Sequence, residues 1–188
     1  GAGHNSVPPP GPVSTLRVMS SVRTLDVPTV DLGPWWSGGR EARASIGRAF
    51  DQAARTVGFV QITGHLVPDA VIDAMVRTGD EFFGLPPGEK LACRPTDLTV
   101  NRGYAASGTE ALSYSIGEAA PPDLFEAFNI GEDEVDETDA FYDAERHRMF
   151  AENIWPPRPD GFRTALVDYF AEARRVALTL TDVFAEAL

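Results

Sequence analysis

The sequence predicts an α+β fold in which amphipathic helices are combined with a few short strands. Three segments, near residues 41–57, 68–83 and 161–188, carry apolar residues at the spacing of one helix face. Short runs of β-branched and aromatic residues, bounded by glycine or proline, lie between them and indicate strands. With 188 residues, 43% of them hydrophobic, the chain is one ordinary domain or a large piece of one.

The first elements along the chain are a strand and a helix. Val27–Leu32 is predicted as a short strand, with Pro28 near its start, where the missing N–H costs least. Residues 33–39, rich in glycine with one proline, are typical of a turn-rich connection. A helix is predicted over residues 41–57 and Gly58 ends it. Its predicted buried face consists of Ile46, Ala49, Phe50, Ala53 and Val57.

A second strand and helix follow. Phe59–Thr63 lies between two glycines and consists largely of strand-forming residues. Pro68 suits the first turn of a helix, because its absent N–H is no loss there. That helix is predicted to run to about Phe83, where Leu85–Gly88 breaks it. Its apolar stripe consists of Val71, Met75, Thr78 and Phe82.

The rest of the chain is predicted as loop, strand and one long helix. Residues 93–118 are mostly loop, 124–130 form a buried strand, and the acidic run 132–137 is a solvated loop rather than a calcium site. The helix starts near Gly161 and continues to Leu188 without a capping residue. We therefore expect the domain to continue beyond this end. The predicted apolar face consists of Phe162, Leu166, Tyr169, Phe170, Ala173, Val176, Ala177, Leu180 and Phe184.

Composition excludes several classes of partner. A net charge of −12 opposes binding to nucleic acid or to anionic membrane, since both require a cationic surface. No apolar run approaches the ~20 residues of a membrane span. Cys93 is the only cysteine, which favours a reducing, cytoplasmic location and a structural or incidental thiol. Residues 1–26 are predicted to be a flexible leader or a cloning remnant.

Six short blocks occur in a fixed order along the chain. They are Val27–Leu32, Gly58–His65, Phe82–Lys90, Arg102–Tyr104, Pro122–Gly131 and Asn153–Pro156. Together they resemble the N-terminal half of isopenicillin N synthase-like iron(II)/2-oxoglutarate-dependent oxygenases. The resemblance implies that residues 27–188 are the α+β flanking segment of a double-stranded β-helix, or jelly roll. Strands near Val30 and Ile62 would then extend the main sheet, and absent barrel strands would cover the last helix.

The same resemblance implies Fe(II), 2-oxoglutarate and molecular oxygen as reactants with a small organic substrate, although one branch of the family dispenses with 2-oxoglutarate. Relatives hold iron with a His-x-Asp or His-x-Glu pair and a second histidine. His4, His65 and His147 are the only histidines, and none lies in that motif. On a helix Asp143 and His147 would share a face, but solvated surface is favoured. We therefore predict no catalytic residue and no metal ligand in this chain.

Four residues are candidates for substrate binding by their position in the family. Arg102 would pair with a substrate carboxylate through its planar fork, and Tyr104 would add a hydroxyl contact. Phe128 and Asn129 would line the pocket. The competing interpretation is structural, with Arg102 holding a loop and Tyr104 packed in a half-buried position.

Two functional hypotheses follow. The first is that the parent protein is an oxidoreductase of this family, and that the 188 residues alone show no turnover. The alternative is a complete, non-catalytic binding module whose exposed apolar helix face requires a partner.

Overall fold

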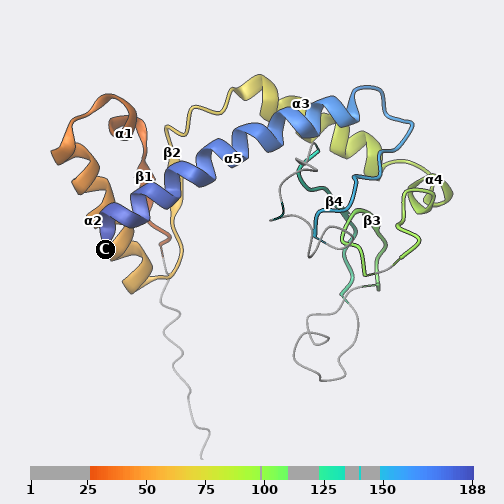
Figure 1. The fold of residues 1–188 in the computed structure, drawn as a ribbon, viewed down its shortest axis with the longest axis horizontal. Coiled ribbons are helices and arrows are strands. Elements are labelled where there is room, and N and C mark those ends of the chain that lie inside the picture. The colour runs from red at the N-terminus through yellow and green to blue at the C-terminus, as the bar shows by residue number, and fades with distance from the viewer. Residues whose placement is uncertain (1–25, 98, 110–122, 134–139, 141–148) are drawn as a thin grey trace, which may run out of the picture.

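The computed structural model describes residues 26–97, 99–109, 123–133, 140 and 149–188. One long helix, α5 (Phe162–Ala187), runs the length of the molecule (Figure 1). Helices α1 and α2 and strands β1 and β2 gather at its C-terminal end, and α4, β3 and β4 gather at the other (Figure 1). The predictions for residues 1–25 and for Asp143 and His147 fall outside the described residues.

A two-stranded parallel sheet lies at the C-terminal end of α5. Strand β1 (Thr29–Asp31) pairs with β2 (Gln61–Thr63), with Val30 opposite Ile62. The prediction of a turn-rich connection over residues 33–39 is wrong for residues 33–37, which form the short helix α1 (Gly33–Ser37). Pro34 starts the helix, and the indole of Trp36 donates a hydrogen bond to the carbonyl of Gly64 at 2.9 Å. Tertiary packing of the tryptophans thus overrides the glycine-rich local pattern.

Helix α2 (Arg40–Thr56) confirms the predicted amphipathic helix. Ile46, Phe50 and Ala53 are buried as predicted, while Ala49 and Val57 are partly buried. The face packs against α5 and β1. The core at this end of the molecule consists of Val30, Leu32, Trp35, Ile46, Phe50 and Val183.

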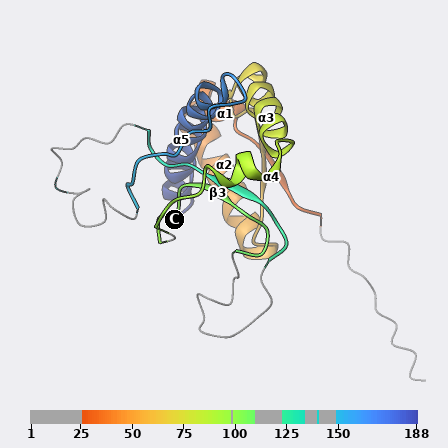
Figure 2. The same cartoon turned by 90° about the vertical axis from the view of Figure 1, so that its right-hand side faces the viewer.

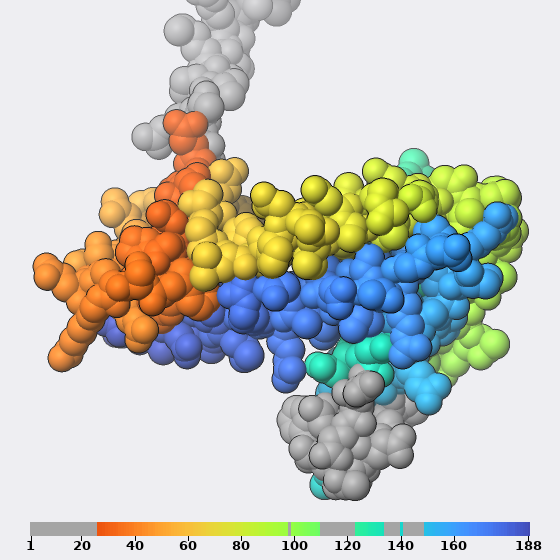
Figure 3. All heavy atoms as spheres, turned by 90° about the horizontal axis from the view of Figure 1, so that it is seen from above, coloured from red at the N-terminus to blue at the C-terminus, as the bar shows by residue number. Residues whose placement is uncertain are grey.

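Helix α3 (Asp69–Phe83) confirms the second predicted helix and lies beside α5 (Figure 3). After the break at Leu85 and Pro86, the short helix α4 (Pro87–Leu91) forms. Viewed along the molecule, α4 and β3 lie below the pair of α3 and α5 (Figure 2).

Strand β3 (Gly103–Ala105) pairs antiparallel with β4 (Ala127–Asn129), with Tyr104 opposite Phe128. Residues 93–118, predicted as mostly loop, therefore contain a strand. The predicted buried strand 124–130 is shorter than expected and only partly buried, since Leu124 is 89% exposed.

A second core lies under this sheet. It consists of Phe82, Cys93, Tyr104 and Phe162, with Phe128, Ile154 and Trp155 among the partly buried residues packed against it. The Phe82 ring lies 4.8 Å from the Phe128 ring and 5.1 Å from the Phe162 ring, between centroids. Helix α5 therefore contributes to both cores, through Phe162 near its start and Val183 near its end.

The buried face of α5 differs in part from the predicted one. Phe162 and Val176 are buried as predicted, but Phe184 is 49% exposed and Ala177 is exposed. Ala165, Thr179 and Val183, which lie outside the predicted face, are also buried. The predicted residues Leu166 and Leu180 pack against the two cores, and the Phe184 ring contacts that of Phe50. In the part of the chain that is described, no helix combines the length and apolarity that a bilayer crossing requires.

Candidate functional site

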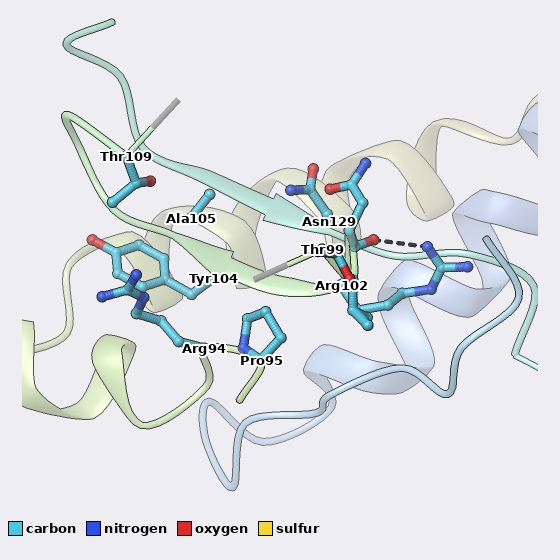
Figure 4. A pocket seen from close by; sticks show the side chains of 10 residues that line it. Arg94, Pro95, Thr99, Arg102, Tyr104, Ala105, Thr109 and Asn129 are labelled. Atoms are coloured by element: carbon cyan, nitrogen blue, oxygen red, sulfur yellow. Dashed lines mark hydrogen bonds between the residues drawn. The ribbon is translucent and has the colours of Figure 1, made fainter. Parts of the chain in front are cut away.

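A pocket of about 360 Å³ lies at the β3–β4 sheet and the segment that follows α4 (Figure 4). The structure brings three of the four candidate residues, Arg102, Tyr104 and Asn129, to this one pocket. Ten residues line it: Arg94, Pro95, Thr99, Val100, Asn101, Arg102, Tyr104, Ala105, Thr109 and Asn129.

Arg102 is a buried cation held by backbone carbonyls. Its side chain donates hydrogen bonds to the carbonyl oxygens of Asn101 at 2.7 Å, Ala151 at 3.1 Å and Met149. Only 8% of the residue is exposed, and burial lowers the pKa of its guanidinium. Gly131 is required beside it, because a Cβ at that position would overlap the guanidinium. Arg102 thus fastens the segment around residues 149–151 to β3 while it lines the pocket.

Tyr104 belongs to a polar network with Lys90 and Glu126, in which Tyr104 and Lys90 are buried and the Glu126 side chain is 37% exposed. Its hydroxyl donates to a carboxylate oxygen of Glu126 at 2.9 Å, and the Lys90 ammonium donates to the same oxygen at 2.6 Å. Lys90 also donates to the carbonyl of Phe83 at 3.0 Å and lies 5.6 Å from the Tyr104 ring centroid. The network ties α4 and the end of α3 to both strands of the sheet.

The network shifts the protonation of its members. The hydrogen bonds from Lys90 and Tyr104 lower the pKa of Glu126 below its ordinary value. The hydrogen bond to Glu126 raises the pKa of Lys90. Burial, followed by the hydrogen bond to Glu126, raises the pKa of Tyr104. Near neutral pH Lys90 and Glu126 are therefore both ionised, and the phenol of Tyr104 is neutral.

Phe128 and Asn129 are adjacent in the sequence, but one side chain lies in the second core and the other lines the pocket. Phe128 is not among the residues that line the pocket; its ring packs against Phe82, Phe162 and Trp155 in the second core. Asn129 lines the pocket, from its register position opposite Gly103.

Arg94 lines the same pocket and was missed by sequence reasoning. It comes shortly after α4 and lines the pocket together with Tyr104; Figure 4 shows its side chain toward the opposite end of the sheet from Arg102. Among the residues described, its guanidinium has no hydrogen-bond or ion-pair partner. The sequence around it, Cys93-Arg94-Pro95, carries no motif that would have indicated a binding role.

Asp133 holds the segment that follows β4. One of its carboxylate oxygens accepts from Asn153 at 3.2 Å and Trp155 at 3.0 Å, and the other accepts from Arg163 at 2.8 Å. Burial alone raises the pKa of Asp133, but the hydrogen bonds, led by that from Arg163, outweigh it and the pKa is lowered. The expectation of a solvated loop over 132–137 is therefore wrong for Asp133; residues 134–137 lie outside the described residues.

The described residues do not fit an iron site. They contain no group of three or more His, Cys, Asp or Glu side chains that could hold a metal ion. His65 Nδ1 instead accepts a hydrogen bond from the Val67 amide at 3.1 Å, a structural contact after β2. Cys93 is buried, which raises the pKa of its thiol.

Comparison with known proteins identifies the family to which the chain belongs. Residues 27–158 match the family model described as the non-haem dioxygenase in morphine synthesis N-terminal region. The chain belongs to this family, which confirms the resemblance to the N-terminal half of the oxygenases.

Individual relatives agree with that assignment. The chain is 34% identical over 168 residues to validamycin A dioxygenase of Streptomyces hygroscopicus subsp. limoneus, covering 88% of this chain and 44% of the relative. It is 28% identical over 171 residues to the 2-oxoglutarate-dependent dioxygenase thnC of Trichoderma harzianum, covering 89% and 50%. The chain thus spans about half the length of the curated relatives it matches.

A solved structure shares the fold. The crystal structure of a 2OG-Fe(II) oxygenase family protein from Caulobacter crescentus superposes with a TM-score of 0.67 at 19% identity, covering 86% of this chain and 48% of that one. At this identity the likeness concerns the fold alone.

Proposed function

We propose that this chain is the N-terminal part of a non-haem iron(II)- and 2-oxoglutarate-dependent oxidoreductase that uses molecular oxygen on a small organic substrate. The family match over residues 27–158 and the dioxygenase names of the relatives support this proposal. Iron would be held by residues outside this chain, because none of the three histidines in the sequence lies in a His-x-Asp or His-x-Glu motif. The cytoplasmic location and the absence of nucleic-acid partners stay predictions.

Within that enzyme, the chain would supply scaffold and one wall of the substrate pocket. Arg102, Tyr104 and Asn129 would form the wall, and Phe128 would hold it from behind through its ring contacts in the second core. The observation that carries this proposal is that three residues implied by the family resemblance lie on one pocket, although β3 and β4 are distant in sequence.

We propose further that the chain is the flanking segment of a jelly roll. Exposed apolar residues of α5 support this: Leu178 is 60% exposed, and Phe184 is still 49% exposed although its ring contacts that of Phe50 in α2. Barrel strands from the remaining half of the protein would cover them, and β1 and β2 would extend the main sheet.

The test compares this 188-residue chain with the full-length gene product. Each is mixed with Fe(II) and 2-oxoglutarate, and oxygen consumption and succinate formation are measured with and without 2-oxoglutarate. We expect turnover only from a product that includes a His-x-Asp or His-x-Glu motif beyond Leu188. Turnover by the 188 residues alone, or tightly held iron in them, would overturn the assignment of the ligands. A gene that ends at Leu188 would favour the non-catalytic module instead.

A further inference from the structure

The candidate pocket is cationic in an acidic protein. The whole chain carries 28 acidic and 16 basic residues, with a net charge of −12. The ten residues that line the pocket nevertheless include two arginines, Arg94 and Arg102, and no aspartate or glutamate. A positive site on a negative surface attracts an anion locally while the rest of the protein repels it.

The charge of Arg102 is not neutralised by its contacts. All three of its hydrogen-bond acceptors are carbonyl oxygens, which satisfy the N–H groups but carry no negative charge. Among the described residues, two carboxylates of the segments around the pocket have partners of their own. Glu126 accepts from Lys90 and Tyr104, and Asp97 accepts from the amide and the hydroxyl of Thr99 at 2.9 and 2.8 Å.

The lining also presents unused hydrogen-bond donors. Within the described part of the chain, the guanidinium of Arg94 and the carboxamides of Asn101 and Asn129 make no hydrogen bond. A guanidinium offers two parallel N–H groups whose geometry matches a carboxylate, and a carboxamide adds a further N–H. Figure 4 shows Asn129 near Arg102 and Arg94 at the other end of the sheet, so the donors border the pocket on more than one side.

We propose that this pocket binds a small organic carboxylate, and that Arg94 is the residue that pairs with the carboxylate group. Asn101 and Asn129 donate to the remainder of the ligand, and the buried charge of Arg102 strengthens the attraction without direct pairing. This inference rests on the proposed function, because it names the chemical class of the substrate for the pocket proposed there.

The test measures binding rather than turnover. Four anions (acetate, succinate, phenylacetate and N-acetylglycine) and the neutral amide phenylacetamide are titrated into the ¹⁵N-labelled chain, and amide shifts of Ala105 and Asn129 are followed by NMR. The variants are Arg94→Gln, Arg94→Lys and the control Arg48→Gln. Arg48 is an exposed residue of α2 outside the pocket, without a partner among the described residues.

We expect at least one carboxylate to give saturable shifts, with phenylacetamide weaker than phenylacetate. Arg94→Gln should weaken binding about tenfold, as expected for loss of a charged hydrogen bond. Arg94→Lys should restore part of the affinity, because it retains charge but not the fork. Arg48→Gln should change nothing.

Three outcomes would overturn the proposal. They are no saturable shift from any of the four anions, equal binding of phenylacetate and phenylacetamide, or unchanged affinity in Arg94→Gln. Inorganic phosphate is titrated as a further anion, and tighter binding of phosphate than of every carboxylate would also overturn the stated ligand class. Because binding is measured without iron or 2-oxoglutarate, loss of binding refutes this inference alone, whereas binding without turnover in the full-length product refutes only the oxygenase assignment.

Discussion

Phe82 is the residue on which the pocket end of the molecule depends most. Its side chain is fully buried, and its ring contacts those of Phe83, Tyr104, Phe128 and Phe162. Phe82→Ala should cost about 3–5 kcal/mol of unfolding free energy, since it removes a buried ring and leaves a cavity among aromatic neighbours. That is a large share of the ~5–15 kcal/mol that stabilises a typical domain.

The adjacent Phe83 provides a matched control. It is the same residue type in the same helix, but 38% of it is exposed and its only ring contact among the described residues is with Phe82. Phe83→Ala should cost about 1 kcal/mol, the typical value for a point mutation. If Phe82→Ala does not fold, Phe82→Leu keeps most of the volume and should cost no more than about 1.5 kcal/mol.

Urea unfolding measures these differences, followed by circular dichroism and by tryptophan fluorescence. Trp155 reports on this core directly, because its ring lies 6.4 Å from those of Phe128 and Phe162. If Phe83→Ala lowers the unfolding free energy as much as Phe82→Ala, burial does not decide the ranking and the reasoning fails.

Two further predictions concern residues that contact Arg102 and Tyr104 from outside the pocket. Lys90→Met should lower the melting temperature most near neutral pH. Because the pKa of Glu126 is lowered, the stability that the Lys90–Glu126 pair contributes is present above the ordinary carboxyl pKa and is lost as pH falls through the lowered value. Scanning fluorimetry across pH measures the difference in melting temperature between the variant and the unchanged chain. A difference that stays constant into acid would contradict the prediction. Gly131→Ala should destabilise the chain by forcing Arg102 aside, whereas Gly79→Ala, in open space within α3, should stabilise it by roughly 0.5–1 kcal/mol. Urea unfolding ranks the two variants, and the opposite order would refute the packing argument.

The local sequence pattern was sufficient to predict the buried face of a helix where that face is narrow. The face of α2 was predictable because Ile46, Phe50 and Ala53 recur at helical spacing between polar residues. Helix α5 carries apolar residues around much of its circumference, so the sequence permits several faces. Packing against α2 and α3 decides that Ala165, Thr179 and Val183 are buried as well, and that outcome is non-local.

The candidate site shows the same limit of prediction from local sequence. The resemblance indicated Arg102, Tyr104 and Asn129, and the structure brings them to one pocket. Strand β3 was missed because Gly103–Ala105 lacks the β-branched residues that mark strands; its formation depends on pairing with β4. The Lys90–Glu126 pair joins residues 36 positions apart. Arg94 has no hydrogen-bond or ion-pair partner among the described residues, and this depends on its surroundings rather than on any local sequence pattern.

Helix α5 has a consequence for how the molecule melts. Its 26 residues connect two cores: Phe162 and Leu166 near its start contribute to one, and Leu180 and Val183 near its end contribute to the other. A released half would be near or below the ~12–15 residues at which an isolated helix becomes marginal in water, so it would fray once its core opened. Unfolding of either core should therefore destabilise the helix and, through it, the other core. We expect the two ends of the molecule to unfold in a single cooperative transition.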